Sequence, residues 1–112
     1  MMDLHRGDIC LVNFNPAKGG EIGKLRPAVI LSDFNDNKIL DTVIVIPLST
    51  VIVDNATPYR YHIKQRDNLR QDSDLCIYEI RSLSKTRIKE KISKLKDNEI
   101  KTLQNYLCQI IQ

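Results

Sequence analysis

Residues 42–48 read TVIVIPL, a run that is apolar at almost every position. A strand with one wet face alternates apolar and polar residues, whereas a strand covered on both faces is apolar throughout. The run therefore predicts a central strand that is packed on both sides. Ser49 and Thr50 follow it directly, so two hydroxyl groups come where a buried strand ends.

Four further short runs lie on either side of this strand. They are DICLVNF (8–14), PAVILSD (27–33), YRYHIK (59–64) and DLCIYEI (74–80). Their Val, Ile, Tyr and Phe content predicts strands, and the Gly-, Pro-, Asn- and Asp-rich segments between them are typical of turns. Residues 59–64 alternate, which puts Arg60, His62 and Lys64 on a polar face that is a candidate binding surface.

The C-terminal segment predicts a helix. Asp97 is expected to cap it, and Glu99 lies in the first turn, where a negative charge is favourable. Apolar residues then recur along one stripe, at Ile100, Leu103, Leu107 and Ile110. Residues 83–95 remain ambiguous, because their apolar residues fall at helical spacing while the same segment also fits a strand after a turn at Ser84. The economical architecture is a small β-barrel-like sheet with a C-terminal helix packed on it.

Length and composition set the class of protein. A chain of 112 residues with 42% hydrophobic residues is sized for one domain, residues 1–112. No apolar stretch is long enough for a membrane span and no secretion signal is visible, so we expect a cytoplasmic protein. Cys10, Cys76 and Cys108 are odd in number and far apart, which favours neither disulfides nor a zinc site; we expect all three to be buried.

Charge is unevenly distributed along the chain. The formal net charge is +3, with −2 in residues 1–56 and +5 in residues 57–112. A basic half favours an anionic partner such as nucleic acid or an acidic peptide, although solvated surface lysines account for the same excess.

Several kinds of chemistry are disfavoured. The loop KGGEIGK (18–24) has the wrong glycine spacing for a phosphate-binding loop, and Leu25 stands where a Ser or Thr would hold magnesium. His5 and His62 have no partner at metal-binding or triad spacing, so we expect both to be surface residues. The serine hydrolase motif G-x-S-x-G is absent.

Arg26, the hydroxyl pair and Glu21 remain as candidates. Pro27 favours extended backbone at Arg26, and the apolar strand behind it gives the guanidinium a rigid base. The alternatives are a surface ion pair of Arg26 with Glu21 or Asp33, and a turn-forming hydroxyl at Ser49.

The order of motifs resembles one known family. RGDICLVNFNPAKGGEIGKLRPAVILS (6–32) is similar to the N-terminal signature of the MazF/PemK toxin ribonucleases: R-G-D, a strand ending in N/D-x-x-P, a G-S-E-x-G loop, and R-P-x-x-x-x-S. The similarity continues through VIVIPLST (43–50), LCIYEIRSLSKTRI (75–88), KISKL (91–95) and the final helix. It therefore covers nearly the whole chain.

The resemblance implies a small, strongly bent antiparallel β-barrel of SH3-like type with a C-terminal α-helix, and it favours a strand at residues 88–94. It implies a homodimer that cleaves single-stranded RNA at short motifs without metal or cofactor, leaving a 2′,3′-cyclic phosphate and a 5′-OH. It also implies a cognate antitoxin with an acidic, partly disordered segment. Other functions that remain open are a gyrase poison of the CcdB type and a non-catalytic SH3-like module, although sparse aromatics weigh against a peptide-binding groove.

The resemblance also implies site residues. The family's arginine falls on Arg26, its loop glutamate on Glu21, and its catalytic threonine on Ser49, which keeps the hydroxyl and loses the methyl that stiffens it. Gly20 stands where the family has serine, and Ile22 replaces a polar neighbour. Whether Ser49 or Thr50 supplies the key hydroxyl stays open. Further substrate contacts are expected at Lys18, Gly20, Lys24, Thr50 and Arg81.

Overall fold

The computed structural model describes residues 2–14 and 25–112. In chain order, these residues form β1 (Asp8–Asn13), β2 (Leu25–Ile30), α1 (Phe34–Ile39), β3 (Thr42–Ser49), β4 (Arg60–Ile63), β5 (Ser73–Cys76), the 3₁₀ turn η1 (Ile77–Glu79), β6 (Arg81–Ser84), the 3₁₀ turn η2 (Lys85–Arg87), β7 (Ile88–Lys94) and α2 (Asp97–Ile111).

β3 is the centre of the sheet, as its apolar sequence predicts. β2 pairs along one edge of β3, while the other edge carries β6 along its first half and β5 at its end. All pairs are antiparallel, and the strand order is β4-β5-β3-β2-β1-β7 with β6 beside β3. One eight-residue strand therefore joins every part of the sheet.

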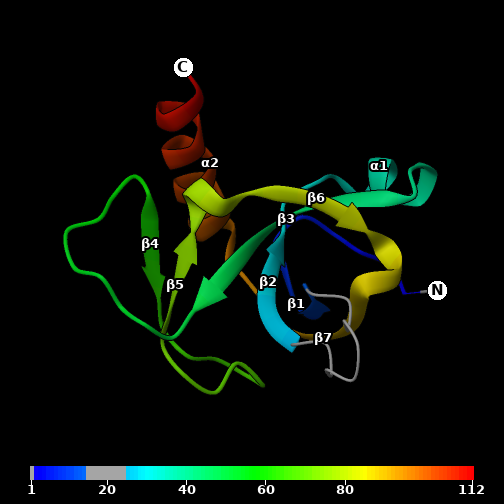
Figure 1. Cartoon of the computed structure of the whole chain (residues 1–112), viewed down its shortest axis with the longest axis horizontal. Helices are drawn as coiled ribbons and strands as arrows, with labels where there is room; N and C mark the ends of the chain where they lie inside the picture. Colours follow the sequence, from blue (N-terminus) through cyan, green and yellow to red (C-terminus); the bar gives the residue numbers. More distant parts are fainter. Residues whose placement is uncertain (1, 15–24) are drawn as a thin grey trace, which may run out of the picture.

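The sheet curls strongly, so that β2, β1, β7 and β6 follow one another around a common interior (Figure 1). β6 passes into β7 through η2. Within residues 2–14 and 25–112 no ladder joins β7 to β6 or to β4, so the closed barrel implied by the resemblance is not confirmed. The fold is a mainly β, antiparallel sheet with a C-terminal helix.

Two clusters of apolar side chains pack on opposite faces of β2 and β3. We call the first the inner core; it contains Leu4, Cys10, Val12, Ala28, Ile30, Val43, Val45 and Ile88. The outer core lies beneath α2 and contains Ile9, Val29, Leu31, Ile46, Leu48, Ile63, Leu69, Leu75, Ile77, Ile92, Leu95 and Leu103. The predicted helical stripe is confirmed, since Ile100, Leu107 and Ile110 pack against this outer core beside Leu103.

The structure corrects three expectations about the elements. The strand expected at residues 74–80 ends at Cys76, because residues 77–79 form the 3₁₀ turn η1, in which the Ile80 N–H donates to the carbonyl of Ile77. Residues 34–39 were expected as a turn and form α1, in which Asp33 accepts from the Asn35 N–H at 3.0 Å. β6 was not predicted, since its four residues RSLS include only one apolar side chain.

Two further expectations are wrong in detail. The N-cap of α2 is Lys96, not Asp97; its N–H donates to Glu99 Oε1 at 2.7 Å. Cys108 is exposed on α2, whereas Cys10 and Cys76 are buried as expected.

Candidate functional site

Arg26 is the second residue of β2, and its side chain lies on the inner-core face at the edge of that core. In the ladder it pairs with Val12, an inner-core residue, so their side chains share a face. Its Nη2 donates to the carbonyl of Leu48 at 3.3 Å, which ties the guanidinium to the end of β3. No carboxylate among residues 2–14 and 25–112 pairs with it, and the expected alternative partner Asp33 instead caps α1.

Ser49 lies on the same face at the end of β3. It stands two residues beyond Pro47, which pairs with Ala28 of the inner core, and alternation keeps both side chains on one side. Ser49 Oγ accepts the Val51 N–H at 3.1 Å. A hydroxyl that accepts from the backbone keeps its own proton to donate, so Ser49 presents a donor beside the arginine.

Arg81 also borders this face. It pairs with Val45 of the inner core, and its guanidinium lies 5.1 Å from the centre of the Phe14 ring. Glu79 Oε1 stands 3.9 Å from Arg81 Nη2 on the exposed side. Arg26 and Arg81 thus place two guanidinium groups at the end of the inner core.

Thr50 lies elsewhere. It lines a cavity of about 420 Å³ with Leu11, Pro27 and Ile92, and Leu11 and Ile92 belong to the outer-core side of the sheet. The hydroxyls of Ser49 and Thr50 therefore lie on opposite faces of the sheet, Ser49 on the inner-core face and Thr50 on the outer-core face. Of the other predicted residues, Glu21, Lys18, Gly20 and Lys24 lie outside the described residues.

The sequence analysis did not single out Asp74, whose side chain lies next to Ser49 on the same face of the sheet. It pairs with Ser49 on one side and His62 on the other, across β3, β5 and β4. Asp74 is 1% exposed. Burial alone would raise the pKa of its carboxyl, but hydrogen bonds from Val53, Arg60 and His62, with the charge of Arg60, hold the pKa below its usual range.

His62 is half-exposed, as expected, but it has partners that no sequence spacing indicated. Its Nδ1 lies 3.3 Å from Asp74 Oδ1, and its Nε2 lies 3.8 Å from Asp72 Oδ2. The only sequence signal was the polar face of residues 59–64 together with Asp74, the acidic residue that begins the apolar run 74–80.

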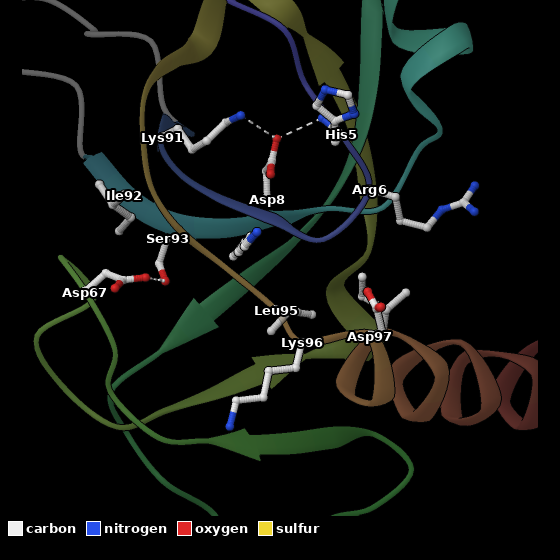
Figure 2. Close-up of a pocket in the computed structure, with 12 residues that line it drawn as sticks. His5, Arg6, Asp8, Asp67, Lys91, Ile92, Ser93, Leu95, Lys96 and Asp97 are labelled. Atoms are coloured by element: carbon white, nitrogen blue, oxygen red, sulfur yellow. Dashed lines mark hydrogen bonds and ion pairs between the residues drawn. The ribbon is translucent and has the colours of Figure 1, made fainter.

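A separate cavity lies away from this site. It measures about 820 Å³ and lies between β1, β7 and the start of α2 (Figure 2). Polar side chains that line this cavity bond one another. Lys91 Nζ lies 3.0 Å from Asp8 Oδ2, and Ser93 Oγ donates to Asp67 Oδ2 at 2.7 Å. Of the predicted site residues that the structure describes, none lines it.

The described residues contain neither a metal-binding cluster nor a helix suited to a membrane. No group of three or more His, Cys, Asp or Glu side chains in this part of the chain is arranged to hold a metal ion. Neither helix in these residues is long and apolar enough to cross a bilayer.

Comparison with known proteins gives consistent matches over nearly the whole chain. The family model described as "PemK-like, MazF-like toxin of type II toxin-antitoxin system" matches residues 5–111. The chain is 36% identical over 103 residues to the endoribonuclease MazF of Staphylococcus saprophyticus, covering 91% of this chain and 86% of that protein.

Solved structures of low sequence identity share the fold. MazF in a MazE–MazF crystal structure from Deinococcus radiodurans superposes with a TM-score of 0.82 at 18% identity, covering 99% of this chain and 97% of that one. The Mycobacterium tuberculosis toxin MazF-mt6 gives 0.75 at 17% identity, covering 93% and 95%.

Proposed function

The chain belongs to the PemK-like, MazF-like toxin family of type II toxin–antitoxin systems, and from this premise we propose how it acts. It is an endoribonuclease. We propose that it cuts single-stranded RNA at a short sequence motif, without a metal ion or cofactor, and leaves a 2′,3′-cyclic phosphate and a 5′-OH.

One observation carries this proposal: the Arg26 guanidinium and the Ser49 hydroxyl share the face at which the inner core ends. RNA supplies its own nucleophile, the 2′-OH next to the scissile phosphate, so the protein need only orient the backbone and stabilise charge. The planar fork of Arg26 suits two phosphate oxygens, and Ser49 Oγ–H donates to the same group.

The bond changes are few. The 2′-oxygen bonds to phosphorus and the bond from phosphorus to the 5′-oxygen breaks. The proton of the 2′-OH passes to a base, for which we propose Glu21, and the departing 5′-oxygen takes a proton from water to become the 5′-OH. Arg81 joins Arg26 in holding the phosphates, and Lys18, Gly20, Lys24 and Thr50 are proposed as further substrate contacts.

The first test is cleavage of an RNA oligonucleotide in EDTA. We expect wild type to cut it, and Arg26→Ala to lower kcat/KM by about 100- to 1000-fold, the usual effect of removing one donor that stabilises transition-state charge. Lys38→Ala, which removes an exposed cation on α1, is the matched control and should leave the rate within about 2-fold.

Replacing the 2′-OH at the cut site by hydrogen should abolish cleavage. Continued cutting of that deoxy substrate would refute the self-attack mechanism. Growth arrest with intact RNA and altered DNA topology would instead indicate a gyrase poison.

We further propose a homodimer in the cytoplasm, in which residues 1–112 form one toxin domain with barrel-like curvature. Its antitoxin would carry an acidic, partly disordered segment that covers the face of Arg26, attracted by the charge of +5 in residues 57–112. Relief of growth arrest on co-expression with a neighbouring small acidic protein is the test.

A further inference from the structure

The segment that follows Ser49 is held by polar bonds and not by packing. Its three apolar side chains are unusually open: Val51 is 68% exposed, Ile52 41% and Val53 46%. Apolar side chains fix a segment only when they leave water, so something else must determine the course of the chain here.

Asp74 is that determinant. Its Oδ2 accepts the Val53 N–H at 2.9 Å and Arg60 Nη1 at 3.2 Å. Arg60 Nη1 also donates to the carbonyl of Val51 at 2.8 Å. A buried carboxylate needs such donors, because a charge left unpaired in the interior strongly destabilises the fold.

These bonds continue to the reactive hydroxyl. The carbonyl of Val51 is held by Arg60, and the N–H of the same residue donates to Ser49 Oγ. A chain of hydrogen bonds therefore runs from Asp74 through Arg60 and Val51 to Ser49; we call it the Asp74 network. Because the Val51 N–H occupies a lone pair of Ser49 Oγ, the hydroxyl keeps its own proton to donate.

We propose that Arg60 and Asp74 are positioning residues for the Ser49 hydroxyl. They act through Val51 and touch no substrate. The inference rests on the proposed role of Ser49 and adds to it, since it assigns the control of that hydroxyl to two residues outside the family signature quoted above. Serine, unlike threonine, lacks a methyl that restricts χ1, and the network supplies the missing restraint.

The test separates kcat from KM on an RNA oligonucleotide. Arg60→Met should lower kcat by about 10- to 100-fold with KM changed less than about 3-fold, because small misplacement of a catalytic group costs that much. Arg60→Lys should recover part of kcat. Asp74→Asn should lower kcat, as Arg60→Met does. Lys101→Met removes an exposed cation on α2 and serves as the charge control.

A double variant decides between positioning and general stability. In a Ser49→Ala background, Arg60→Met should cause no further loss, since the group that it positions is gone. The same 10- to 100-fold loss in both backgrounds would overturn the proposal. Circular dichroism and the melting temperature of each variant exclude unfolding as the cause.

A measurement without RNA keeps the two proposals separate. Amide hydrogen exchange at Val51 and Val53 should be faster in Arg60→Met than in wild type and unchanged in Lys101→Met. If wild type fails to cut RNA, the proposed function is wrong, and exchange still decides whether the network holds Ser49. Unchanged exchange in Arg60→Met overturns the network itself.

Discussion

At the scale of single residues, the choice between Ser49 and Thr50 depends on the face that each occupies. Ser49 lies beside Arg26, while Thr50 lines the cavity on the outer-core side. We predict that Ser49→Ala lowers kcat by about 100-fold or more, as loss of a preorganised donor does. Thr50→Ala should leave kcat within about 3-fold and raise KM at most slightly. Single-turnover cleavage assays measure both.

Ser49→Thr gives the reverse control. It keeps the hydroxyl and adds a methyl that favours one rotamer, so it should retain activity. Equal loss of kcat in Ser49→Ala and Thr50→Ala would contradict the assignment.

The same scale shows what the sequence can and cannot reveal. Arg26 and Ser49 can be singled out as candidates because their signals are local: a following proline for one, the end of an apolar run for the other. Their proposed roles come from the family resemblance. Asp74 cannot be singled out in this way, because its partners Val53, Arg60 and His62 lie 21, 14 and 12 residues away along the chain. Only the folded sheet brings them together.

At the scale of elements, the start of α2 depends on Glu99. Its carboxylate accepts the Lys96 N–H and pairs through both oxygens with Arg66, with Nη2 to Oε2 at 2.8 Å. We predict that Glu99→Gln lowers the free energy of unfolding by about 1 to 3 kcal/mol at pH 7, the range for hydrogen bonds to charged groups. Urea denaturation measures it, with the exposed Glu90→Gln as control.

The pH dependence has a definite sign. The hydrogen bond from Arg66 lowers the pKa of Glu99 in the folded chain below its ordinary value, although burial opposes this. The contribution of the charged Glu99 to the free energy of unfolding is therefore complete above the pKa that this group has in the unfolded chain. It is lost as pH falls through the lower pKa of the folded chain. The difference between wild type and Glu99→Gln should shrink in acid; a difference that grew below pH 4 would contradict this account.

β7 explains why periodicity misled at residues 83–95. Ile88 lies in the inner core and Ile92 in the outer core, although a regular strand would put both on one face. The pairing with β1 contains two register shifts, between Ile9 and Cys10 and between Leu11 and Val12. Such bulges move side chains to the other face, so the apolar spacing imitates a helix. The resemblance correctly favoured a strand over residues 88–94.

At the scale of the whole molecule, the two cores follow from one sequence feature, whereas closure of the sheet does not. β3 is apolar on both faces, which predicts packing on both sides, and both cores are present. How far the sheet curls depends on bulges and 3₁₀ turns that join distant segments, and these leave little mark on composition.

The three cysteines test whether the two cores unfold together. Burial, with the nearby charge of Asp8, raises the pKa of Cys10 to about 12, and burial raises the pKa of Cys76. Only thiolates react readily, so we predict one rapidly labelled thiol in each native chain, at the exposed Cys108. Cys108→Ser should remove the rapid phase.

The two slow thiols then report on cooperativity. Cys10 belongs to the inner core, while Cys76 lies on β5 between the outer-core residues Leu75 and Ile77. Because β3 pairs with strands of both regions, we expect both thiols to become reactive with the same free energy, that of global unfolding. Labelling rates in low urea measure each value. A smaller value for Cys76 would mean that β4 and β5 open on their own, and the Asp74 network would then open with them.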